Sequence, residues 1–184
     1  MVLVAITGNI ACGKSTLLNE FRKLGEKCID CDEISREVYK LKTVKKMLVK
    51  TFGTCDRKKI AKIVFRDHKA RKKLEAIIHP FILRRLKRFI DSRSEDRFFI
   101  EVPLLYECSL EKFFDYVVVV KAPKKIQLKR IVSRGLTEEE ALLRIKTQFP
   151  LSKKIKMADF VVDGTKNKSQ LKQIAKDIIE RVKT

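Results

Sequence analysis

Eight consecutive residues near the start of the chain match a phosphate-binding loop. Residues 8–15 read Gly-Asn-Ile-Ala-Cys-Gly-Lys-Ser, the pattern G-x-x-x-x-G-K-[ST], whose glycines let backbone N–H groups turn toward an anion. In such loops the lysine bridges the β- and γ-phosphates, and the hydroxyl residue is a ligand of Mg²⁺. The alternative, a glycine turn with a solvated lysine, is disfavoured by the strand and helix patterns on either side. The predicted ATP-binding residues are Gly8, Ala11, Cys12, Gly13, Lys14, Ser15 and Thr16.

Two aspartates, Asp30 and Asp32, follow the second predicted strand and are candidates for a catalytic base. The carboxyl ends of strands in an α/β sheet face the ligand crevice, and residues two apart on an extended segment share a face. Transfer of a phosphoryl group to a hydroxyl needs a carboxylate that accepts the proton. The alternative for Asp32 is the N-cap of a helix beginning at Glu33.

A third carboxylate, Glu101, ends the apolar run of a later predicted strand. P-loop proteins place there the acidic residue that holds Mg²⁺ directly or through water. We therefore predict Mg²⁺ as cofactor, with Ser15 and Glu101 at the metal. The alternative is a surface carboxylate paired with one of the many lysines.

Arginines late in the chain could belong to a mobile lid. Arg130, Arg134 and Arg144 lie in a charged segment, and a closing lid brings arginines onto transferring phosphates and excludes water. We predict Arg130 and Arg144 as catalytic residues, together with Lys14, whose ammonium we expect to be exposed. For any single arginine, solvated surface is the simpler interpretation.

The elements that must position these residues form an α/β pattern. Short apolar segments at 2–7, 27–30, 98–102, 116–120 and 160–162 alternate with helical patterns, which is typical of a parallel sheet covered by crossover helices. Residues 33–90 show helical patterns alone, and Pro80 within them either starts a new helix or kinks one. We predict a P-loop NTPase-type α/β fold with a five-stranded parallel sheet flanked by helices. The predicted core comprises residues 1–32 and 91–184 with a helical lid at about 130–157, and residues 33–90 form a helical substrate-binding insertion.

The charge of the chain predicts an anionic partner. Its 184 residues include 43 Lys and Arg against 23 Asp and Glu, a formal charge of +20, and residues 57–88 hold 13 basic and 2 acidic residues, a charge of +11. Nucleic acid or a phosphorylated small molecule fits this charge, and a thermophilic composition is a further explanation. A nucleic-acid-binding module leaves the phosphate loop and the aspartates unexplained, so we predict no nucleic-acid partner.

Cellular location is predicted from what the sequence lacks. No apolar run approaches the roughly 18 residues of a membrane span, and the N-terminus does not resemble a signal peptide. Five cysteines are an odd number, which favours free thiols in a reducing compartment. Because Cys28 and Cys31 have no second pair, we interpret them as core residues and not as metal ligands. We expect a cytoplasmic monomer with no membrane partner.

Seven segments, in this order and spacing, resemble the dephospho-CoA kinase family over nearly the whole chain. Three of them precede residue 81, namely Thr-Gly-Asn-Ile-x-Cys-Gly-Lys-Ser-Thr from Thr7, Ile29-Asp30-x-Asp32 and Ile78-His79-Pro80. The others are Val102-Pro103-Leu104-Leu105-x-Glu107, Gln127-Leu128-x-Arg130, Arg144 with Gln148, and Ala158-Asp159-Phe160-Val161-Val162-Asp163. Another small-molecule P-loop kinase would share Lys14 and Ser15, but His79-Pro80 and Pro103-Leu104-Leu105 argue against it.

The resemblance implies transfer of the ATP γ-phosphate to the 3′-hydroxyl of dephospho-CoA, with Asp32 as base. It also implies an acceptor-binding helical insertion and a lid after the fourth strand, and the pyrophosphate of dephospho-CoA then accounts for the basic insertion. We assign acceptor binding to residues of the insertion and of the strand ends, namely Asp30, Asp32, His79, Pro80, Arg84, Pro103 and Leu104.

The sequence departs from the family pattern at two places. The loop after Phe52-Gly53 is shorter than in many members, and Gly164 stands where an Asn commonly follows the last-strand aspartate. The first change trims a surface loop, and the second leaves adenine contacts near Asp163 undefined.

Overall fold

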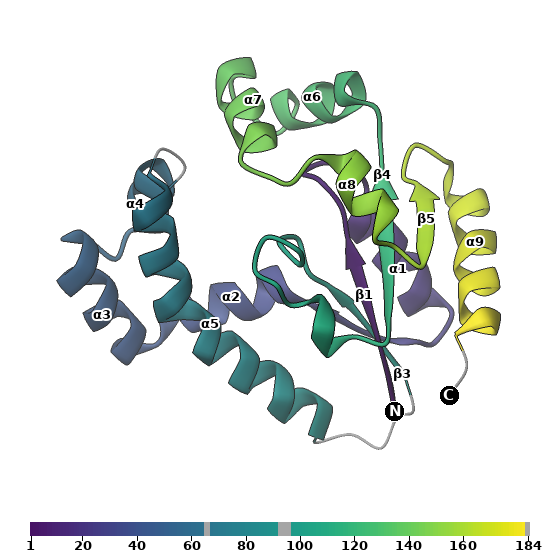
Figure 1. The fold of residues 1–184 in the computed structure, drawn as a ribbon, viewed down its shortest axis with the longest axis horizontal. Coiled ribbons are helices and arrows are strands. Elements are labelled where there is room, and N and C mark those ends of the chain that lie inside the picture. Colours follow the sequence, from purple (N-terminus) through teal and green to yellow (C-terminus); the bar gives the residue numbers. More distant parts are fainter. Residues whose placement is uncertain (65–66, 92–96, 183–184) are drawn as a thin grey trace. The chain divides into compact units, whose positions relative to one another are not determined.

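The computed structural model describes residues 1–64, 67–91 and 97–182 (Figure 1). Residues 65–66, 92–96 and 183–184, which belong to the predicted insertion and core, lie outside that description. The chain divides into two compact units. The first comprises Met1–Asp30 and Glu95–Thr184, and the second comprises Cys31–Ser94.

The first unit contains a five-stranded, all-parallel sheet. Its strands are β1 (Val2–Thr7), β2 (Lys27–Asp30), β3 (Arg97–Glu101), β4 (Tyr116–Lys121) and β5 (Phe160–Asp163), in the order β2-β3-β1-β4-β5. The predicted fold class and all five predicted strands are confirmed, with boundaries that differ by at most one residue. Because β1 is central and all strands run the same way, the loop after β1 lies amid the carboxyl ends of its neighbours.

Both faces of the sheet are buried, as continuous apolar strands require. Val118 and Val120 of β4 pack in a cluster with α1 (Lys14–Lys23) and α9 (Lys168–Arg181), through Phe21 and Ala175 among others. The alternate residue Val119 is also buried. Phe21 of α1 stacks on Phe99 of β3, with ring centroids 3.9 Å apart. This contact holds α1 against the sheet, so that the N-terminus of α1 lies at the end of the phosphate loop.

Three further helices and a short turn complete the first unit. These are η1 (Glu111–Phe113), α6 (Lys124–Val132), α7 (Glu138–Lys146) and α8 (Leu151–Lys156). Thr137 caps α7 in a capping box with Glu140, which defines where that helix begins. A second apolar cluster joins Ala11 of the phosphate loop to Ile131 and Ala141, so α6 and α7 pack directly on the loop.

All regular secondary structure in the described part of the second unit is helical. The unit contains α2 (Cys31–Lys40), α3 (Lys42–Phe52), α4 (Arg57–Val64) and α5 (His68–Asp91). Pro80 lies inside α5, so the chain flanking His79-Pro80 forms one helix in place of two. Within the described residues, we found no helix with the length and hydropathy of a membrane span.

Candidate functional site

The loop between β1 and α1 has the backbone geometry that its glycines predict. Gly8 has φ +142° and Gly13 has φ +104°, values that glycine adopts without strain. A Cβ on Gly8 would meet the Val120 carbonyl oxygen, so the residue is also required for close packing. Gly13 is the N-cap of α1 and carries no capping side chain, and this helix N-terminus is suited to bind phosphate.

Lys14 lies over the loop, contrary to our expectation of an exposed ammonium. Its Nζ atom donates to the carbonyl oxygens of Gly8 and Asn9, each at 3.1 Å. The residue is only 7% exposed. Folding of the loop around its own lysine brings the charge to the place where the phosphate groups of a nucleotide would bind.

Ser15 and Glu101 meet at the carboxyl end of the central strands. The Ser15 hydroxyl donates to Glu101 Oε1 at 3.2 Å, and Glu101 is 4% exposed. Asp30 is the register partner of Glu101 across β2 and β3, so the two carboxylates end neighbouring strands. Hydroxyl and carboxylate oxygens are the donors that Mg²⁺ prefers, and this pair fits the predicted metal. No cluster of three or more histidine, cysteine or acid side chains with metal-binding geometry occurs among the described residues.

Arg130 of α6 joins the phosphate loop to the turn after β5. Its guanidinium donates to the carbonyl oxygens of Ala11 and Gly164, each at 3.0 Å. Ala11 has φ +59°, so this bond helps to hold a strained peptide in place. Contact of Arg130 with a transferring phosphate stays a prediction.

Close packing requires a glycine at position 164. A Cβ there would clash with the Cys12 carbonyl oxygen and approach the Val120 side chain at 2.7 Å. The turn after β5 therefore lies directly against the phosphate loop, and an asparagine would not fit this backbone arrangement. The preceding Asp163 accepts bonds from the N–H and hydroxyl of Thr165, which lower its pKa.

Burial keeps the loop cysteine in its thiol form. Cys12 is fully buried and packs in the core cluster. Its pKa is raised by burial, against the opposing charge of Lys14. The thiol is therefore a packing group and not a nucleophile.

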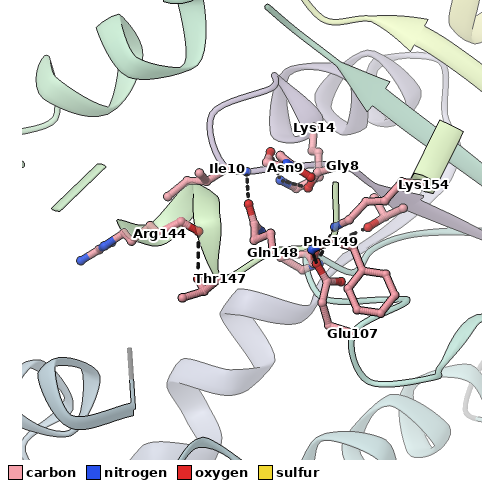
Figure 2. Close-up of polar contacts among 12 residues, drawn as sticks. Gly8, Asn9, Ile10, Lys14, Glu107, Arg144, Thr147, Gln148, Phe149 and Lys154 are labelled. Atoms are coloured by element: carbon pink, nitrogen blue, oxygen red, sulfur yellow. Dashed lines mark hydrogen bonds and ion pairs between the residues drawn. The ribbon is translucent and has the colours of Figure 1, made fainter. Parts of the chain in front are cut away.

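Gln148 contacts the phosphate loop and is absent from the predicted site residues. Its Oε1 accepts the Ile10 N–H at 2.8 Å (Figure 2). A separation of 138 residues explains why no local pattern indicates the contact, although the family resemblance includes this glutamine. The side chain of Arg144, one turn earlier, extends away from the loop in Figure 2, and its catalytic role stays a prediction.

Two predicted acceptor-binding residues follow β3 directly. Pro103 and Leu104 are half-buried, and the Pro103 carbonyl oxygen lies 3.5 Å from the Thr7 hydroxyl. They are thus adjacent to the end of β1, and their contact with the acceptor stays a prediction.

Of the other predicted acceptor residues, Asp30 ends β2 in the first unit, and the remaining four belong to the second unit. Asp32 lies in the first turn of α2, which begins at Cys31, so Asp32 is not the N-cap that we considered. His79, Pro80 and Arg84 are all on α5. Arg84 is exposed, with its guanidinium 5.9 Å from the Phe81 ring.

His79 is half-buried and resists protonation. Burial lowers its pKa and the nearby Arg71 acts in the same direction, whereas Glu75 opposes them. When the pKa of a histidine is lower in the folded than in the unfolded state, the histidine contributes to stability at pH values above its ordinary pKa. This contribution is lost as the pH falls through the pKa of the folded state.

We expect the free energy of unfolding to fall between pH 7.5 and pH 5.5 in part because of His79. As the pH drops through about 6.5, the ordinary pKa of histidine, the unfolded chain takes up a proton that the folded chain resists. His79→Gln should reduce this pH dependence in urea titrations, whereas His68→Gln, at the exposed start of α5, controls for loss of a histidine. Equal pH dependence in wild type and His79→Gln would contradict the assignment.

Comparisons with known proteins agree with these motifs. The family model of dephospho-CoA kinase matches residues 2–173. A dephospho-CoA kinase of Aquifex aeolicus is 36% identical over 192 aligned residues, which cover 99% of this chain and 98% of that protein.

Two solved structures extend the similarity to the fold. A Thermus thermophilus protein has a TM-score of 0.86 at 30% identity and covers 100% of this chain and 98% of its own. A dephospho-CoA kinase from Campylobacter jejuni has a TM-score of 0.66 at 29% identity, covering 98% of this chain and 96% of its own. The chain belongs to the dephospho-CoA kinase family.

Proposed function

We propose that this protein transfers the γ-phosphate of ATP to the 3′-hydroxyl of dephospho-CoA, giving coenzyme A and ADP. The observation that carries the proposal is the phosphate loop, with Lys14 over it and Ser15 bonded to Glu101, in a chain of this family. Transfer to an alcohol requires bound phosphates, a neutralising cation and a proton acceptor, and the chain has candidates for each.

The first unit supplies the groups that bind the nucleotide. Backbone N–H groups of the loop and the N-terminus of α1 bind the phosphates, and Lys14 neutralises charge that develops on the transferring group. Ser15 and Glu101 would hold Mg²⁺, which shields the phosphate oxygens when bound. Arg130 keeps the loop in shape through Ala11 and belongs to the same unit as the phosphate loop.

The second unit supplies the base and most of the proposed acceptor-binding residues. Asp32 accepts the proton of the attacking hydroxyl, and it lies two residues beyond Asp30 at the end of β2. The basic cluster of residues 57–88 binds the pyrophosphate of dephospho-CoA, with Arg84 among its members. We further propose that the reaction takes place in the cytoplasm and that the enzyme is a monomer without nucleic-acid or membrane partners.

An ADP-release assay with ATP and Mg²⁺ tests the proposal. We expect turnover with dephospho-CoA and background rates with nucleosides, nucleotides or buffer. Turnover with a nucleoside and none with dephospho-CoA would overturn the acceptor assignment while leaving the phosphate loop as the site of ATP.

Charge reversal in the insertion should weaken acceptor binding selectively. We expect Arg84→Glu to raise the KM for dephospho-CoA about tenfold or more, since a hydrogen bond to a charged group contributes about 1.5–3 kcal/mol. The KM for ATP should stay close to wild type. Arg85 is a poorer target because it already pairs with Glu37 at 2.7 Å.

Lys46→Glu is the matched control for that variant, because Lys46 is an exposed residue of α3 in the same unit. If Arg84→Glu raised the KM for ATP and left that for dephospho-CoA unchanged, the assignment of the two substrates to the two units would be wrong.

A further inference from the structure

A buried ion pair lies outside the phosphate loop, in the first unit. Glu107 follows β3, and its Oε1 lies 2.8 Å from Nζ of Lys154 on α8. The Lys154 side chain is 0% exposed and that of Glu107 is 3% exposed. Lysine is almost never fully buried in proteins unless it is paired, as Lys154 is here.

Stability alone is a poor explanation for this pair. Removing two charges from water costs more free energy than their attraction commonly returns, and apolar replacements of similar volume are often neutral or stabilising. Within the described part of the chain, Glu107 Oε2 has no hydrogen-bond partner. The carboxylate is therefore incompletely compensated, and its position needs another explanation.

The same carboxylate oxygen holds the segment that reaches the phosphate loop. Glu107 Oε1 accepts the backbone N–H of Phe149 at 2.9 Å, and Phe149 follows Gln148 directly. The Gln148 carboxamide in turn accepts the Ile10 N–H at 2.8 Å. Figure 2 draws these contacts, from Lys154 and Glu107 through Phe149 and Gln148 to Ile10.

The contact with Ile10 acts on the peptide unit that holds the loop lysine. Ile10 N–H and the Asn9 carbonyl belong to one planar peptide group. The Asn9 oxygen accepts from Lys14 Nζ at 3.1 Å. Fixing the N–H of this peptide therefore fixes the direction of the carbonyl that places the Lys14 ammonium.

We propose that Glu107, held by Lys154, is a positioning residue that places Gln148 on the Asn9–Ile10 peptide and so orients Lys14 for phosphoryl transfer. The inference rests on the proposed function for its kinetic consequence. Its structural consequence, the state of the Ile10 amide, is independent of any substrate.

Two double variants separate the effect of the hydrogen bond to Phe149 from the effect of the two buried charges. Glu107→Gln with Lys154→Met removes both charges and keeps an oxygen that accepts the Phe149 N–H. Glu107→Leu with Lys154→Met removes both charges and this acceptor. Neither variant leaves a lone buried charge, so both avoid the main reason for misfolding.

We expect the variant with Glu107→Gln, the amide-bearing variant, to keep kcat near wild type. The variant with Glu107→Leu, the leucine-bearing variant, should lose about 10–100-fold in kcat, because a small misplacement of a catalytic group is costly. Hydrogen exchange of the Ile10 amide, followed by NMR on the full chain without substrates, should accelerate in the leucine-bearing variant alone. The KM for dephospho-CoA should be similar in both.

Combining the variants tests whether Glu107 affects kcat and Ile10 exchange through Gln148. Gln148→Ala should lower kcat and speed Ile10 exchange by itself, and adding Glu107→Leu with Lys154→Met should lower kcat no further. Additive losses, or a lower Tm with unchanged kcat and Ile10 exchange, would show that the pair is merely structural and overturn the proposal.

Two further outcomes separate this inference from the proposed function. If the leucine-bearing variant fails to fold, Gln148→Ala decides, since unchanged Ile10 exchange in that variant contradicts the linkage. If wild type does not phosphorylate dephospho-CoA, the proposed function fails, while the Ile10 measurements still support or overturn the positioning role.

Discussion

Lys14→Ala should abolish phosphoryl transfer and leave the protein folded. We expect kcat to fall by at least about 10²–10³-fold, the usual loss when one preorganised donor to developing charge is removed. The Lys14 ammonium donates to the loop carbonyls of Gly8 and Asn9, and its truncation removes no apolar side chain from the core, so Tm should stay close to wild type. Steady-state kinetics and thermal unfolding of the same sample measure both.

Two variants sharpen this comparison. Lys172→Ala removes an equal charge from the exposed face of α9 and should turn over as wild type does. Lys14→Arg keeps the charge but not the compact ammonium, so it should stay well below wild type. Normal kcat in Lys14→Ala would contradict the role of the loop lysine.

Asp32→Asn should lower kcat by about 10²–10⁴-fold, which is the usual contribution of a positioned general base. Asparagine keeps the shape of the side chain but cannot take the proton from the hydroxyl. ATP binding should survive, since the phosphate loop belongs to the other unit. Rapid-mixing measurements of transfer and a separate measurement of ATP affinity distinguish the two effects.

The neighbouring acid provides a matched control. Glu33 is also exposed and in the first turn of α2, where either carboxylate interacts favourably with the helix dipole by about 0.3–1 kcal/mol. Glu33→Gln should therefore produce the same small loss of stability with normal kcat. If Asp32→Asn behaves as Glu33→Gln does, the base is Asp30 or no carboxylate at all.

The sheet and the phosphate loop were predictable because their signals are local. A parallel strand buried on both faces is a continuous apolar run, as at β1 and β4, and the loop glycines are required by backbone angles at Gly8 and Gly13. Each signal depends on a few consecutive residues, so the sequence carries it without knowledge of the fold.

The contacts that shape the site depend on residues far apart in sequence. Arg130 bonds to Ala11 across 119 residues, and Gln148 reaches Ile10 across 138. Nothing in the neighbouring residues distinguishes these side chains from solvated ones. The burial of Lys14 was likewise unpredictable, because the carbonyls that hold it turn inward only once the loop has formed.

Pro80 is a case in which a local rule leaves two alternatives open. Pro80 predicts a break or a kink because it has no N–H to donate and its ring crowds the preceding turn. The structure keeps α5 as one helix around it, with Ile77 and Ile78 buried just before it. A new helix starting at Pro80 is therefore excluded, and the sequence pattern alone could not decide between the two alternatives.

Mass spectrometry and ³¹P NMR of the product formed from ATP, Mg²⁺ and dephospho-CoA test the central claim most directly. We expect one phosphoryl group to be added to dephospho-CoA, as a phosphomonoester on the ribose 3′-oxygen, with ADP formed in equal amount. Release of inorganic phosphate without a phosphorylated acceptor, or a phosphate at another oxygen, would contradict it.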